Sequence, residues 1–200
     1  MTQKPFSQAC ENNKGPILKV LKSAFADVDE VLEIGTGTGQ HAVFFAEHLA
    51  HLSWQPSDVA QHLSGIKLWL QDAQLSNINS PVALNVLDEI WPVARAQAVF
   101  TANTLHIMGE SEVVRFFEKL AEVLAEGGKF CCYGPFNYAG KFSSDSNARF
   151  NDWLAMKNPK SAIRDFEWIE SLAKAAGLQL VADHEMPANN RLLEWGKTPV

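Results

Sequence analysis

Residues 31–40, VLEIGTGTGQ, join a short apolar run to a loop with glycine at positions 35, 37 and 39. A short apolar run bounded by turn residues is typical of a buried strand. Glycines have no Cβ atom, so they permit a tight turn and let a ligand approach the backbone closely. Apolar residues recur at helical spacing in residues 40–50. The segment therefore predicts a strand, a glycine turn and a helix, with a ligand lying on the turn.

The same alternation of strand and helix continues on both sides of this segment. Upstream, Pro16 suits the first position of a helix that carries Ile17, Leu18, Leu21 and Phe25 on one face. Downstream, the pattern predicts strands at 52–55, 81–86, 98–102, 129–133, 178–183 and 191–195, and helices at 59–75, 111–125 and 165–177. Ser111 is expected to cap the second of these helices and Gly127 to end it. This order predicts an α/β fold with a parallel sheet covered on both faces, and a final hairpin.

Composition limits the class of protein. The chain has 200 residues, 46% of them hydrophobic, which suffices for one sizeable core and predicts a single domain over residues 1–200. Seventeen basic and twenty-three acidic residues give a formal net charge of -6, and no basic run is dense enough for a phosphate stripe. We therefore expect no nucleic-acid partner.

The cysteines and the apolar runs predict the compartment. The chain has an odd number of cysteines, Cys10, Cys131 and Cys132, and their spacing is not that of a zinc site. The adjacent pair, Cys131 and Cys132, is expected to point to opposite faces of a strand. No apolar run has the length of a signal-peptide core or a membrane span. We expect a soluble protein of the reducing cytoplasm with no membrane partner.

The spacing of the glycine loop narrows the ligand. The dinucleotide fingerprint requires its third glycine at position 40, where this chain has Gln40. Glu33 beside the loop further disfavours an anionic diphosphate. Asp58, nineteen residues beyond Gly39, follows the next strand and can accept hydrogen bonds from both ribose hydroxyls of an adenosine. These features favour a nucleoside without phosphate, S-adenosyl-L-methionine, with S-adenosyl-L-homocysteine as product.

Polar residues also follow the third and fourth strands. Asn85 or Asp88 can accept from the adenine amino group, and a backbone N–H there, near Val86, can donate to the ring. Asn103 and the backbone at Thr104 are expected to orient the methionine part of the cofactor, while His106 faces the substrate and acts as a base. These residues form the expected reaction edge.

Each of these residues also has a purely structural interpretation. Asp58 can cap the following helix, Asn103 can satisfy loop backbone, and His106 can be a buried histidine bonded to a carbonyl. His41, His48 and His51 fit no zinc signature, so we interpret them as solvated or core residues and expect no metal. The aromatic residues between positions 136 and 153 are interpreted as packing rather than as a substrate cage.

Beyond these motifs, the sequence resembles an uncharacterised family of class I S-adenosylmethionine-dependent methyltransferase-like proteins, domain of unknown function 938, which has a vertebrate methyltransferase-like member. The resemblance runs nearly end to end. It is carried by residues 11–18 (ENNKGPIL), 31–41 (VLEIGTGTGQH), 54–58 (WQPSD), 100–108 (FTANTLHIM), 133–136 (YGPF) and 186–190 (MPANN). It implies a Rossmann-like seven-stranded sheet of order 3-2-1-4-5-7-6 and a bound S-adenosylmethionine. The substrate is unassigned across the family.

Motif and resemblance together give three sets of candidate residues. The cofactor side comprises Glu33, Gly35, Thr36, Gly37, Gly39, Gln40, His41, Asp58, Asn85, Val86, Asp88, Asn103 and Thr104. The catalytic candidates are His106 and Asn103, and the substrate side comprises Glu11, Asn13, Tyr133, Asn137, Asn189 and Asn190. Residues 1–26 are expected to form a helical segment folding over the cofactor, and residues 134–165 an excursion covering the pocket.

The function expected from this set is methyl transfer to a small-molecule acceptor, with a protein substrate left open. The nucleophile can be oxygen, nitrogen, sulfur or carbon, and the sequence does not determine the oligomeric state. Two other classes stay open: a non-catalytic module that binds S-adenosylmethionine or S-adenosylhomocysteine, and an NAD(P)-dependent reductase on a related sheet.

Overall fold

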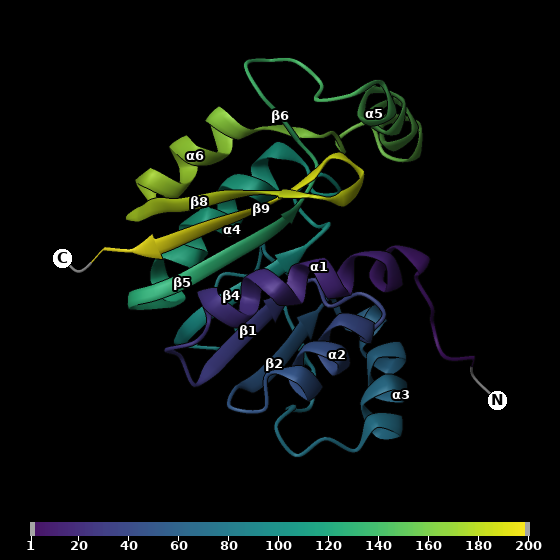
Figure 1. Cartoon of the computed structure of the whole chain (residues 1–200), viewed down its shortest axis with the longest axis vertical. Helices are drawn as coiled ribbons and strands as arrows, with labels where there is room; N and C mark the ends of the chain where they lie inside the picture. Colours follow the sequence, from purple (N-terminus) through teal and green to yellow (C-terminus); the bar gives the residue numbers. More distant parts are fainter. Residues whose placement is uncertain (1–2, 199–200) are drawn as a thin grey trace.

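The alternating elements build a seven-stranded sheet in the computed structural model, which describes residues 3–198 (Figure 1). The strands lie in the order β3-β2-β1-β4-β5-β9-β8, the order that the resemblance implies. Their bounds are β1 Glu30–Ile34, β2 Ser53–Asp58, β3 Val82–Ala83, β4 Ala96–Ala102, β5 Leu124–Gly134, β8 Leu178–Met186 and β9 Asn190–Lys197. β1 to β5 pair in parallel, and β9 pairs antiparallel with both β5 and β8. The predicted α/β class and the final hairpin are confirmed.

Helices cover both faces of this sheet because successive strand residues point to opposite sides. The helices are α1 Gln8–Ala24, α2 Gln40–His48, α3 Leu63–Ala73, α4 Glu110–Val123, α5 Asp145–Lys157 and α6 Phe166–Ala175. Cys131 packs into the core beneath α1 and α2, whereas Cys132 packs into the core beneath α4 and α6. The predicted division of this cysteine pair between the two faces is confirmed.

Two predicted helix starts were wrong. α1 begins at Gln8, so Pro16 lies in its interior and the start is capped by Ser7, whose hydroxyl accepts from Cys10 N at 3.5 Å. α4 begins at Glu110 with Gly109 as its cap, because the Glu112 side chain reaches back to accept from Gly109 N at 2.6 Å. Ser111 already lies inside this helix.

Other boundaries also differ from those predicted, and the strand expected at 81–86 is shortened to β3, Val82–Ala83. α4 ends at Val123 and β5 starts at Leu124, ahead of Gly127. A 3-10 turn, Ala60–His62, precedes α3, so residues 59–75 do not form one helix. β2 extends to Asp58, through Pro56, because residues 53–57 pair with β1 and Asp58 pairs with Ala83 of β3.

The expected excursion at residues 134–165 contains a helix, α5, that was not expected from the sequence. The short strands β6, Phe136–Asn137, and β7, Arg164–Asp165, pair in parallel on either side of α5. α5 lies beside the turn between β8 and β9 (Figure 1), where Asn147 Nδ2 donates to Asn189 O at 3.1 Å. Across residues 3–198, no helix is both long and apolar enough to span a bilayer.

Phe100 tests how far the sheet depends on the aromatic cluster beneath α2. Its side chain is fully buried, and its ring centroid lies 5.3 Å from that of Phe45 and 6.0 Å from that of Trp54. Phe100→Ala should lower the free energy of unfolding by about 3–5 kcal/mol in urea denaturation, because it leaves a cavity. Phe142→Ala, at a half-exposed position, is the control and should change it by less than about 1 kcal/mol. Equal losses in both variants would contradict this packing.

Candidate functional site

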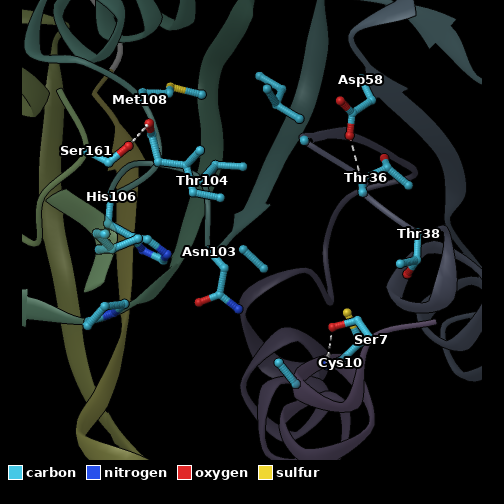
Figure 2. A pocket seen from close by; sticks show the side chains of 18 of the residues that line it. Ser7, Cys10, Thr36, Thr38, Asp58, Asn103, Thr104, His106, Met108 and Ser161 are labelled. Atoms are coloured by element: carbon cyan, nitrogen blue, oxygen red, sulfur yellow. Dashed lines mark hydrogen bonds between the residues drawn. The ribbon is translucent and has the colours of Figure 1, made fainter. Parts of the chain in front are cut away.

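A cavity of about 1060 Å³ opens at the carboxyl edge of the sheet, between the ends of β1 and β4. The strand order reverses between these two strands, and this is where ligands bind in open α/β sheets. Figure 2 shows two groups of side chains facing each other across this cavity. Thr36, Thr38 and Asp58 come from the β1 and β2 side, and Asn103, Thr104 and His106 come from the loop after β4.

The glycine loop forms one wall. Gly35 N and Thr36 N both donate to Ser57 O at 3.0 Å, which fixes the start of the loop on β2. Gly35 has a φ of 75°, and a Cβ there would overlap the Thr104 Cγ2 methyl. Gly37 has a φ of 64° and open space where its Cβ would be. Gly35, Thr36, Gly37 and Thr38 line the cavity, whereas Gly39 packs against Trp69 and Ile66 of α3.

Asp58 stands at the end of β2 and faces the loop. Its Oδ2 accepts from Gly37 N at 2.6 Å, and its Oδ1 accepts from Val59 N at 2.7 Å and lies 2.8 Å from His62 Nδ1. A carboxylate offers about four acceptor sites, so one remains free and a second becomes free if the half-exposed His62 ring moves away. Asp58 therefore binds two backbone N–H groups and lines the cavity, but it does not cap the following helix, since neither the 3-10 turn Ala60–His62 nor α3 has a side-chain cap.

Two residues of the cofactor-side set lie behind the loop rather than in the cavity wall. Glu33 is buried and accepts from Trp54 Nε1 at 3.0 Å and from Thr36 Oγ1 at 3.1 Å. Burial raises the pKa of Glu33 to about 7, although these two donors oppose the shift. Gln40 accepts from Ser7 N at 2.6 Å and donates to Glu11 Oε1 at 2.7 Å. The residue that replaces the third glycine thus ties α1 to the loop.

α1 folds against the loop and brings residues to the cavity that differ from those expected. Asn13 and Glu11 do not line it: Asn13 accepts from His41 Nε2 at 2.6 Å, and Glu11 binds Gln40. His41 is buried, which lowers its pKa to about 4, and it lines the cavity beside Ser7, Ala9 and Cys10. Across residues 3–198, no three His, Cys, Asp or Glu side chains gather as metal ligands do.

The turn after β3 supplies the next part of the wall. Asn85 and Val86 line the cavity together with Leu84. Asp88 does not, since its Oδ2 accepts from Asn85 N at 3.1 Å and so closes the turn. Asn85 Oδ1 accepts from Leu87 N at 3.0 Å, which leaves this oxygen one further lone pair.

The loop after β4 carries the expected reaction edge. Asn103 adopts a φ of 58°, rare outside glycine, and its N donates to Tyr133 O at 2.8 Å. Thr104 contacts Gly35, and its hydroxyl bonds that of Thr101. His106 is buried, and this burial, with the nearby charge of Arg164, lowers its pKa to about 4. Its ring is therefore neutral at pH 7 and faces the cavity (Figure 2).

The expected substrate side is only partly at the cavity. Asn190 lines it, whereas Asn189 binds α5 through Ser146 Oγ, at 3.3 Å, and Tyr133 is buried beneath α1. Asn137 Nδ2 donates to Ile163 O at 3.3 Å, which turns it toward β7. Of the six candidates, Asn190 is the one that the structure places in the wall.

Most of the cavity wall opposite the glycine loop consists of residues that were not predicted from the sequence. α5 supplies Phe150, Trp153, Leu154 and Lys157, and the loop after β4 supplies Met108. Phe150 and Trp153 were interpreted as packing, yet both line the cavity. Positions 150, 153, 154 and 157 follow helical i, i+3, i+4, i+7 spacing, and this signal could have identified the helix and its inward face.

Comparison with protein families identifies the chain. The family described as "Protein of unknown function (DUF938)" matches residues 4–197. This chain belongs to that family. Its members carry no assigned function in that description, so the family supports the expected resemblance without naming an activity.

Solved structures share the fold. An O-methyltransferase family protein from Burkholderia thailandensis is 17% identical, with a TM-score of 0.81 over 92% of this chain and 56% of the other. An O-methyltransferase family 2 protein from Planctomyces limnophilus, in complex with apigenin, is 15% identical, with a TM-score of 0.83 over 95% of this chain and 58% of the other. A third structure is NcsB1, an O-methyltransferase from neocarzinostatin biosynthesis in complex with S-adenosylmethionine and 2-hydroxy-5-methyl naphthoic acid. It is 20% identical, with a TM-score of 0.75 over 96% of this chain and 55% of the other. The chain thus has the Rossmann-like fold of class I methyltransferases, and it spans little more than half of these proteins' lengths.

Gly35→Ala should be the most damaging substitution in the loop. The left-handed backbone at this position destabilises any residue with a Cβ atom by about 1–2 kcal/mol, and the added Cβ would also overlap Thr104 Cγ2. Gly37→Ala is the control and should lose the backbone part alone, because nothing lies within 4 Å of its Cβ position. In urea denaturation, Gly35→Ala should lower the free energy of unfolding more than Gly37→Ala does. In a Thr104→Ser background, which lacks the methyl, the Gly35→Ala effect should shrink toward that of Gly37→Ala. A Gly35→Ala loss that is the same in both backgrounds would contradict the contact.

Glu33 should make the stability of the fold depend on pH. Its pKa is higher in the folded protein than in the unfolded chain, so the native state binds more protons between pH 4.5 and 7 and its stability falls as pH rises through this window. Glu33→Gln should abolish this fall, so wild type should lose on the order of 2–3 kcal/mol relative to the variant from pH 4.5 to 8. Glu126→Gln, at an exposed site, is the control. Parallel stability curves for wild type and Glu33→Gln would contradict the burial of this carboxyl.

Proposed function

We propose that this protein is an S-adenosylmethionine-dependent methyltransferase that acts on a small-molecule acceptor. The observation that carries this proposal is the arrangement of the cavity. The Gly37–Asp58 corner lies on one side of a single continuous space, and Asn103 and His106 lie on the other. A nucleoside site and a reaction edge thereby share one cavity, as transfer between two ligands requires.

The chemistry of the corner fits an adenosine without phosphates. Asp58 can offer ribose hydroxyls up to two acceptor sites once His62 moves away, and Leu84, Asn85 and Val86 form a mostly apolar wall for a base. A diphosphate would need cations or free amides at the loop. Among the described residues, Lys157 is the one lysine or arginine that lines the cavity, and it lies on α5. Gly37 N is already bonded to Asp58.

The known structures support the same assignment. NcsB1 is described in complex with S-adenosylmethionine and an aromatic acid, and the Planctomyces limnophilus protein in complex with apigenin. By this likeness we assign S-adenosylmethionine as cofactor and a small molecule as acceptor. The single-domain organisation over residues 1–200 and the cytoplasmic location stay predictions.

When bound, S-adenosylmethionine supplies an electrophilic methyl group on a positively charged sulfur. Asp58 would hold the ribose, and Asn103 and the Thr104 backbone would position the methionine end. His106 is neutral at pH 7, so it adds no positive charge beside the sulfonium and can accept a proton from the nucleophile. α5 and the turn between β8 and β9, joined by the hydrogen bond from Asn147 to Asn189, would shield the reacting atoms from water once both ligands are bound.

Ligand-dependent stability tests this proposal against its two alternatives. S-adenosylhomocysteine should raise the melting temperature, and NADH and NADPH should not, since a ligand that binds only the native state stabilises it. Isothermal titration should show Asp58→Ala weakening S-adenosylhomocysteine about 10- to 100-fold, because hydrogen bonds to a charged group contribute about 1.5–3 kcal/mol. Asp72→Ala, an exposed carboxylate on α3, is the matched control.

Stabilisation by NADPH alone would identify a reductase and overturn the proposal. Binding of S-adenosylhomocysteine without methyl transfer from labelled cofactor, across acceptor pools and cell extract, would identify the non-catalytic module instead.

A further inference from the structure

Beyond His106 the cavity continues into a chamber with an apolar wall, which we call the acceptor chamber. It is formed by Ile107, Met108, Pro135, Phe150, Trp153 and Leu154. At its mouth, Ile107 is 57% exposed and Trp153 is 48% exposed, although both are large and apolar. Exposed apolar side chains that gather around a cavity mark a ligand-binding surface. The chamber therefore fits an occupant that is mostly apolar.

The chamber wall is aromatic along the line that leads from the reaction edge to solvent. The His106 and Phe150 rings meet edge to face with centroids 5.4 Å apart, and the Phe150 and Trp153 rings stack at 5.8 Å. Aromatic rings interact favourably with further rings in offset or edge-to-face arrangements, and the Met108 thioether also favours aromatic contacts. A flat ring gains more from this wall than a saturated ring of the same size.

The polar groups at the inner end of the chamber restrict the nucleophile. Neither nitrogen of the His106 ring has a hydrogen-bond partner within residues 3–198, and Glu112, the carboxylate that lines the cavity on this side, accepts from Gly109 N at 2.6 Å. Burial and the charge of Arg164 make His106 a weak base, with a pKa of about 4. A phenolic hydroxyl, with a pKa of about 10, loses its proton to such a base far more readily than a hydroxyl as weakly acidic as water, at about 15.7.

We propose that the acceptor is a hydroxylated aromatic compound of one or two rings, which lies along Phe150 and Trp153 with its hydroxyl against His106 and Asn103. This inference rests on the proposed methyltransferase function. The phenolic oxygen forms a bond to the methyl carbon as the carbon–sulfur bond breaks, and sulfur keeps that electron pair. The phenolic proton passes to His106 and then to solvent. The products are an aryl methyl ether, S-adenosylhomocysteine and a proton.

Matched pairs of aromatic and saturated compounds test this class. Phenol, catechol and 2-naphthol are compared with cyclohexanol, 1,2-cyclohexanediol and decahydro-2-naphthol, by titration into the complex with S-adenosylhomocysteine and by transfer of labelled methyl. Binding and ether formation should be confined to the aromatic members. Equal binding of the saturated members, or no binding of any aromatic member to a protein that still binds S-adenosylhomocysteine, would overturn the acceptor class. Failure to bind S-adenosylhomocysteine at all would overturn the proposed function itself.

Variants locate the acceptor within the chamber. Trp153→Ala should raise the KM of the best aromatic acceptor about tenfold, since an aromatic contact contributes up to about 1.5 kcal/mol beyond its area. Its Kd for S-adenosylhomocysteine should not change. Met156→Ala, 77% exposed on the same helix and outside the cavity wall, should leave both values unchanged. His106→Ala should lower kcat with little effect on S-adenosylhomocysteine binding. Unchanged kinetics in Trp153→Ala or in His106→Ala would contradict the placement.

Discussion

The close approach of two loops where β1 and β4 diverge sets the shape of the site. Gly35, just after β1, lies against the Thr104 side chain, just after β4, with no room for a Cβ atom. Thr101 Oγ1 donates to Ile34 O at 2.8 Å and joins the same two strands one step below. Because these contacts lie at the reversal of strand order, they fix the distance between the Gly37–Asp58 corner and the loop after β4 that carries Asn103 and His106. The two loops touch at Gly35 and Thr104 and separate farther from the strand ends, and the space between them there is the cavity.

A second set of contacts holds the glycine loop from behind. Gln40 binds both Ser7 and Glu11, and His41 binds Asn13, so α1 is fastened to the start of α2. These polar side chains are buried or half-buried, and each finds a partner, as buried polar groups require. Residues far apart in sequence thereby hold the loop in its left-handed conformation. The cofactor-side candidates thus divide into those that face the cavity and those that support them.

The sequence predicted the sheet well and the cavity wall less well, for physical reasons. The strands themselves and the loop at Gly35 follow from apolar periodicity and glycine spacing, which are local signals, whereas the strand order was implied by the family resemblance. The start of α1 was misplaced because Ser7 caps it and Pro16 is tolerated in its interior, where tertiary packing overrides propensity. Glu33 was expected at the cofactor, but its bonds to Trp54 and Thr36 depend on the fold and turn it inward. α5 was missed because its inward face, around Phe150, is short and partly exposed.

In the function that we propose, Gly37 and Asp58 form the nucleoside site of a methyltransferase. A crystal structure of the complex with S-adenosylhomocysteine tests it most directly. We expect the ribose hydroxyls within hydrogen-bond distance of the Asp58 carboxylate, the adenine beside Val86, and the His62 ring displaced from its position 2.8 Å from Asp58 Oδ1. A complex in which His62 still binds Asp58 and the nucleoside lies outside the glycine loop would contradict it.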